Sequence, residues 1–104
     1  MFSETYLNTI QYLKNETEPY IDPRLLAWQL KLGLISLEEA QEIYLTYTEK
    51  NLTMVETEVE KHSTDAEKLK AIARTAIRMY RRQMLTEDQA LTIAKNIKKY
   101  LELL

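Results

Sequence analysis

The chain of 104 residues has the length of one domain and carries a formal net charge of −2. It has no cysteine, which excludes a disulfide framework and thiolate catalysis. It has only one glycine and two prolines, and because strand-rich folds need many turn residues, this scarcity favours long helices. No stretch approaches the roughly 18 apolar residues of a membrane span, and no secretory leader is recognisable. We therefore expect a cytoplasmic, all-α domain over residues 1–104.

Capping signals predict where each helix begins. Ser3 and Asp22 are candidate N-caps, and the proline after Asp22 suits a first helical position. Ser36, Thr64 and Thr86 each precede a glutamate or glutamine by three residues, the pattern of a capping box. With the apolar periodicity, these signals predict five helices, at about residues 3–14, 23–32, 37–61, 65–83 and 87–104.

The short second helix is apolar on nearly all sides. Its apolar residues are Leu25, Leu26, Ala27, Trp28, Leu30 and Leu32. A helix without a polar face is usually buried. The sequence therefore predicts a compact bundle in which two αα-hairpins pack around this buried helix, with Trp28 at the centre of the core.

The predicted helix at residues 37–61 has an apolar stripe that shifts along its length. The stripe begins with Leu37, Ala40, Tyr44 and Tyr47 and continues with Leu52, Val55 and Val59. These two sets do not lie on one line, so the stripe drifts or breaks near residues 50–52. Either one long helix changes its packing partners here, or two helices meet at a bend. We favour one long helix.

Two predicted turns resemble each other at an offset of 50 residues. Residues 34–40 and 84–90 both read as two apolar residues, a hydroxyl cap, acidic residues and an alanine. Over residues 30–47 and 80–97, however, only two aligned positions are identical. The sequence therefore predicts two similar hairpins. Convergence of tight helix–helix turns on one pattern explains the similarity more simply than duplication.

Charge is distributed unevenly along the chain. Residues 1–67 carry five Lys/Arg and 13 Asp/Glu, whereas residues 68–104 carry nine and three. In the predicted helix 65–83, the residues expected to face the core are Leu69, Ile72, Ala73, Ala76, Ile77 and Tyr80. Cations recur every three to four residues on the opposite side, and they form the candidate site, a basic ridge of Lys70, Arg74, Arg78, Arg81 and Arg82.

The ridge has three interpretations. It is solvated, or it pairs with acidic side chains inside the bundle or across a dimer, the candidate acids being Glu38, Glu42, Glu49, Glu56 and Glu60. Alternatively, it binds nucleic-acid phosphates, because arginine forks grip phosphate and carboxylate equally well. The excess of acid in the first 67 residues would repel nucleic acid unless it faced away. We therefore favour a ridge that is solvated or directed at protein over one that binds nucleic acid.

Catalytic and metal-binding patterns are sparse. His62 is the only histidine, and Glu58, one helical turn before it, is its only candidate co-ligand. Two ligands do not make a metal site, so we expect a capping or exposed His62 and neither metal nor cofactor. The single glycine excludes glycine-rich phosphate loops.

Together, these observations predict a non-enzymatic protein-binding module, a regulator, inhibitor or assembly factor that binds another protein or self-associates through the long helix. The alternative is a nucleic-acid-binding regulator that uses the basic helix 68–82. Small all-α chains of this kind are common among phage and mobile-element accessory proteins, which is a background expectation only.

Overall fold

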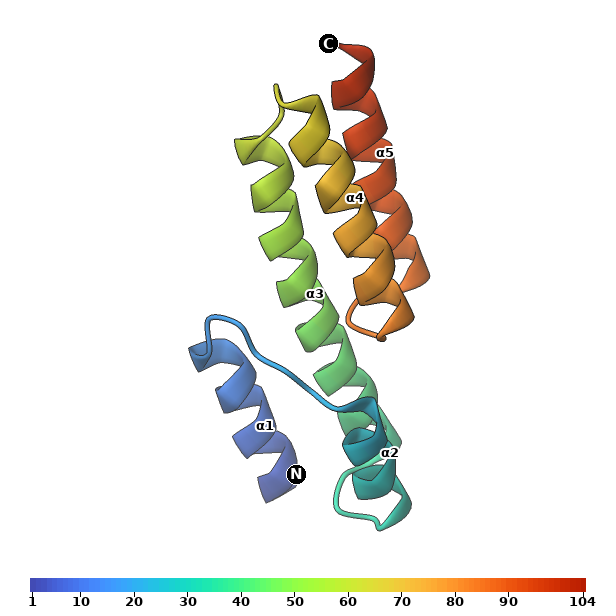
Figure 1. Ribbon diagram of the computed structural model, residues 1–104. Helices are drawn as coiled ribbons and strands as arrows, with labels where there is room; N and C mark the ends of the chain where they lie inside the picture. Colours follow the sequence, from blue (N-terminus) through green and yellow to red (C-terminus); the bar gives the residue numbers. More distant parts are fainter. The chain divides into compact units, whose positions relative to one another are not determined.

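The computed structural model describes residues 1–104 and is entirely α-helical (Figure 1). The five helices are α1 (Glu4–Asn15), α2 (Pro23–Lys31), α3 (Leu37–Lys61), α4 (Ala66–Arg81) and α5 (Glu87–Glu102). The predicted all-α fold class is thus confirmed. The interpretation of residues 37–61 as one long helix is also confirmed, because α3 is continuous over 25 residues.

The chain divides into two units, residues 1–47 and residues 48–104. Unit 1 contains α1, α2 and the first part of α3, and unit 2 contains the rest of α3 with α4 and α5. Each unit therefore draws on three helical segments, and α3 contributes to both. The prediction of one domain over residues 1–104 stays a prediction.

Four of the five predicted caps begin a helix as expected. The side chains of Ser3 and Asp22 accept hydrogen bonds from the backbone N–H groups of Tyr6 and Arg24. Ser36 and Thr86 form complete capping boxes: each hydroxyl accepts from the N–H three residues later, and that later side chain accepts from the N–H of the cap residue.

The cap of α4 is Asp65, not the predicted Thr64. The Asp65 carboxylate accepts a hydrogen bond of 3.1 Å from the backbone N–H of Lys68. A carboxylate at a helix N-terminus is favoured by the helix dipole, and it displaces the neighbouring hydroxyl from the cap position. Because Lys68 has no acceptor to return the bond, α4 begins without a capping box.

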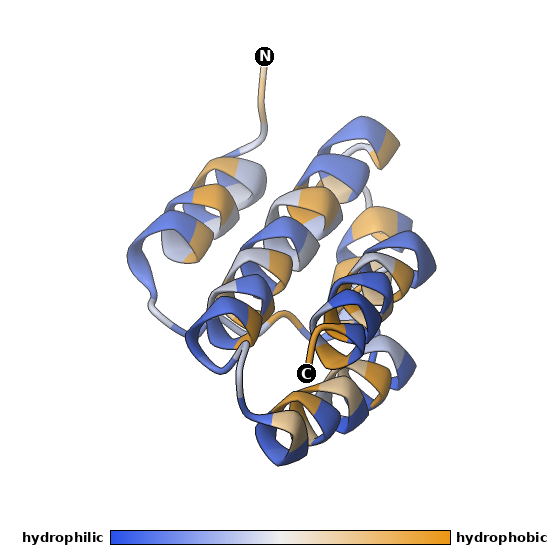
Figure 2. Ribbon diagram, turned by 90° about the horizontal axis from the view of Figure 1, so that it is seen from above, coloured by the Kyte–Doolittle hydropathy of each residue, from blue (hydrophilic) through white to orange (hydrophobic).

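The core of unit 2 joins the end of α3 to α4 and α5. In Figure 2 each of these helices carries both hydrophobic and hydrophilic residues, as amphipathic helices do. The hydrophobic residues meet in one buried cluster, which consists of Val55, Val59, Leu69, Ala76, Leu85, Ile93 and Ile97. Packing of this kind supplies most of the free energy that holds helices together.

The buried stripe of α3 does not break, as expected for the favoured interpretation of one long helix. Two polar residues continue it, because Thr48 and Asn51 are 0% and 1% exposed. Both have partners in the α4–α5 hairpin: the Asn51 side-chain amide donates to the Met84 carbonyl at 2.9 Å, and the Gln89 amide donates to the Thr48 hydroxyl at 3.2 Å. These bonds satisfy groups that would otherwise be costly to bury.

Unit 1 is held together around Glu39. One carboxylate oxygen of Glu39 accepts from the backbone N–H of Ser36 at 2.8 Å. The other oxygen accepts from the Ser3 N–H at 2.7 Å and from the Ser3 hydroxyl at 3.0 Å. The N–H groups of Ser36 and Ser3, in that order, hold the pKa of Glu39 below its usual value. A single carboxylate thus ties the beginning of α1 to the beginning of α3.

The prediction of a buried α2 at the centre of the core is wrong. The helix has no buried residue, and Trp28 is 57% exposed. Helix α2 is the first arm of a hairpin, so its partners within unit 1 cover only part of its circumference. Leu26 and Leu30 are half-buried, and the apolar residues on the remaining sides face solvent.

The α2–α3 and α4–α5 turns have the same hydrogen-bond pattern. Gly33 and Gln83 both adopt a left-handed backbone, with φ of 74° and 61°. In each turn that residue donates to the carbonyl three positions back, and the next residue donates to the carbonyl five positions back, which is a Schellman motif. Each turn then leads into a capping box. The two similar hairpins predicted from the sequence are therefore present.

Replacing Ile93 by alanine should lower the free energy of unfolding by about 2–5 kcal/mol, because Ile93 is fully buried and the truncation leaves a cavity. Urea denaturation followed by circular dichroism measures the loss. Leu91→Ala, on the same helix but 50% exposed, is the control and should change stability by only about 0.5 kcal/mol. Equal losses in the two variants would contradict the assigned core.

Unit 1 should lose stability in acid through Glu39. Because folding lowers the pKa of Glu39 below 4.5, its contribution is fully present above that pH and is lost as the pH falls through the lower folded pKa. Thermal unfolding followed by the fluorescence of Trp28, the only tryptophan, reports on unit 1. Glu39→Gln, which cannot ionise, should have a smaller dependence on pH than the natural chain. The same pH dependence in both would show that Glu39 does not carry it.

Candidate functional site

Helix α4 and its C-cap residue, Arg82, present the five predicted cations to solvent. All five members of the basic ridge are exposed: Lys70, Arg74, Arg78, Arg81 and Arg82. Their three- and four-residue spacing keeps them on the side of α4 opposite the buried Leu69 and Ala76. The ridge that the sequence predicts is therefore one continuous exposed surface on one helix.

Almost none of the ridge charge is neutralised within the chain. Lys70 lies 3.6 Å from Glu67, an exposed pair within α4, and Arg78 donates to the Thr75 hydroxyl at 3.2 Å. Arg74, Arg81 and Arg82 have no ion pair. Pairing inside the bundle with the acidic residues proposed from the sequence therefore does not account for the ridge.

Ile77 and Tyr80, which the sequence predicts to face the core, are instead exposed. Their exposed fractions are 49% and 43%. On the helix surface Ile77 falls between Arg74 and Arg81, three residues after the first and four before the second. The ridge is thus a mixed surface that contains a large aliphatic side chain among its cations. The periodicity of α4 correctly identified the side of the helix that faces the core. It could not show which residues at the margin of that side the neighbouring helices leave exposed.

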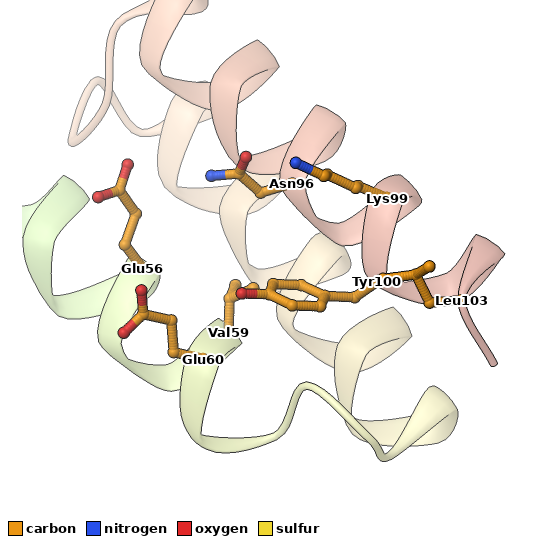
Figure 3. A pocket seen from close by; sticks show the side chains of 7 residues that line it. All are labelled: Glu56, Val59, Glu60, Asn96, Lys99, Tyr100 and Leu103. Atoms are coloured by element: carbon orange, nitrogen blue, oxygen red, sulfur yellow. The ribbon is translucent and has the colours of Figure 1, made fainter.

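A second candidate is a cavity of about 290 Å³ between the end of α3 and α5, which the sequence did not reveal (Figure 3). Two acidic side chains of α3, Glu56 and Glu60, line one side. Asn96, Lys99 and Tyr100 of α5 line the other, and Lys99 has no ion pair with either glutamate. Only the packing of two helices far apart in sequence brings these groups together.

His62 and Glu58 lie together, as their spacing predicts. His62 Nε2 is 3.4 Å from a Glu58 carboxylate oxygen. No third potential ligand, whether cysteine, aspartate or glutamate, lies close enough to complete a metal-binding group with them. The pair joins two neighbouring turns at the end of α3.

None of the helices combines the length and the apolar character that a membrane crossing requires. In comparisons with protein-family models, curated proteins and solved structures, nothing matches the chain. The surfaces of the chain are therefore the basis on which its function is inferred.

Removing two ridge cations should leave the fold intact. Arg74→Ala combined with Arg81→Ala should change the free energy of unfolding by only about 0.5 kcal/mol, because both side chains are exposed and neither is ion-paired. Urea denaturation at low and high salt measures this. A loss above about 1 kcal/mol that disappears at high salt would mean that the ridge is paired within the folded chain.

Proposed function

We propose that the chain is a non-enzymatic protein-binding module that recognises an acidic surface of its partner through the basic ridge of α4. The observation that carries the proposal is the exposed ridge itself, in which Arg74, Arg81 and Arg82 are not ion-paired. A guanidinium group can bind a carboxylate through two parallel N–H···O hydrogen bonds. Because the core already holds α4 in place, the backbone that carries these unpaired arginines loses little conformational freedom on binding.

The composition of the ridge favours a protein partner over nucleic acid. Ile77 lies between two arginines and is 49% exposed, and Tyr80 is 43% exposed nearby on α4. An aliphatic side chain gains nothing from a phosphate backbone, but it can fill a pocket on a protein. Arginine and tyrosine are also among the residues that contribute most to binding energy at protein interfaces.

Binding of nucleic acid by the same helix is the alternative. Arginine binds phosphate as well as carboxylate, and unit 2 has an excess of two positive charges, with 11 Lys/Arg against nine Asp/Glu. Both hypotheses use the same cations, so only a direct comparison of ligands separates them.

Reversing charge on the ridge should remove the partner. The chain is isolated from its own cells after cross-linking, and co-purifying proteins are compared between the natural chain and Arg74→Glu/Arg81→Glu. The matched control is Lys95→Glu/Lys98→Glu, which makes the same charge change on exposed positions of α5. We expect an acidic protein that is retained by the natural chain and the control and lost by the ridge variant.

Direct titration of labelled DNA duplex and single-stranded RNA tests the alternative with the same three proteins. The proposal predicts weak binding that disappears near physiological salt and does not distinguish the ridge variant from the control. Binding that survives at physiological salt and is lost only in the ridge variant would replace the proposal with the nucleic-acid function. Identical sets of co-purifying proteins in all three samples would also contradict it.

A further inference from the structure

Helix α2 carries an exposed apolar face with a basic edge. Leu25 and Trp28 are each 57% exposed and Leu32 is 67% exposed, and their spacing places them on one side of the helix. Arg24 and Lys31 lie along one edge of this side, and the Lys31 ammonium is 5.1 Å from the centre of the Trp28 ring. We refer to these five residues as the α2 face.

The first part of α3 carries a matching face with an acidic edge. Leu37 is 60% exposed and Leu45 is 51% exposed, two turns apart on one side of the helix. Glu38 and Glu42 are exposed beside them, and neither makes an ion pair. These four residues are the α3 face. Both faces belong to unit 1 and both contain exposed leucines. The charges on the α2 face are positive, and those on the α3 face are negative.

Unit 2 shows that the fold does not need these apolar residues. Fifty residues further along, buried positions recur at 85, 93 and 97, matching 35, 43 and 47. At the positions that match the five exposed apolar residues of unit 1, however, unit 2 has polar or charged side chains, all exposed: Thr75, Arg78, Arg82, Glu87 and Lys95. The same hairpin is thus built without an apolar surface there. The hairpin therefore does not need large apolar side chains at these positions in order to fold.

We propose that the α2 face of one chain docks on the α3 face of a second copy. In a two-fold dimer this contact forms twice, because each copy offers both faces. Trp28 and the leucines are then buried at the interface. Arg24 and Lys31 of one copy form ion pairs with Glu38 and Glu42 of the other. Charge complementarity selects a second copy over an anionic membrane, because unit 1 has seven Asp/Glu against three Lys/Arg. The proposal is independent of the ridge on α4.

Charge reversal followed by mixing tests the dimer. Sedimentation velocity is measured over a range of concentrations for the natural chain, for Arg24→Glu/Lys31→Glu and for Glu38→Lys/Glu42→Lys. The natural chain should reach about twice its mass of 12.3 kDa. Each variant alone brings like charges together, so its dissociation constant should rise at least about tenfold. An equal mixture of the two variants should form the dimer again, because both contacts are then complementary.

Lys95→Glu/Lys98→Glu, in unit 2, is the control and should dimerise like the natural chain. Circular dichroism confirms that each variant is folded. A natural chain that stays monomeric overturns the proposal, and so does a mixture that fails to recover the dimer. Vesicles that contain phosphatidylserine are added in a parallel titration. A monomeric chain whose Trp28 fluorescence shifts to shorter wavelength on these vesicles would assign the α2 face to a membrane surface instead.

Discussion

The structure depends on one kind of interaction, in which the two polar atoms of a capping side chain make different hydrogen bonds. One atom caps the side chain's own helix, and the other bonds to a neighbouring helix. Glu39 closes the first turn of α3 with one oxygen and holds Ser3 at the start of α1 with the other. Gln89 does the same in unit 2, where it closes α5 and donates to the Thr48 hydroxyl. Because the free N–H groups of a helix start need acceptors in any case, one residue per unit satisfies a cap and fixes a neighbouring helix.

This shared framework leaves the surfaces free to differ. Unit 2 uses its outer positions for the basic ridge, with Ile77 and Tyr80 at its edge. Unit 1 has exposed Trp28 and Leu32 where the ridge has Arg78 and Arg82, although Arg24 and Lys31 match the ridge cations Arg74 and Arg81. The two proposals therefore concern different parts of the chain. Contact with an acidic partner is assigned to α4, and contact with a second copy is assigned to α2 and the first part of α3.

The features that depend on local sequence could be predicted. Caps such as Ser36 follow from short-range hydrogen bonding, and the ridge follows from the spacing of its cations on one helix. The features that depend on tertiary packing could not. Asn51 is buried although it is polar, Trp28 is exposed although its helix is apolar, and Ile77 lies at the boundary of the core. Gln83 adopts a left-handed backbone conformation, which glycine usually marks in a sequence, so the sequence contained no sign of it.

Amide hydrogen exchange at the N-cap residue of each hairpin's second helix tests the central claim most directly. The N–H of a helix cap has no partner in the helix, so it usually exchanges quickly. The N–H groups of Ser36 and Thr86 instead donate to Glu39 and Gln89 at 2.8 Å each. The account predicts strong protection at both, lost at Ser36 in Glu39→Ala and at Thr86 in Gln89→Ala. Exchange at both amides as fast as in an unfolded chain would contradict it.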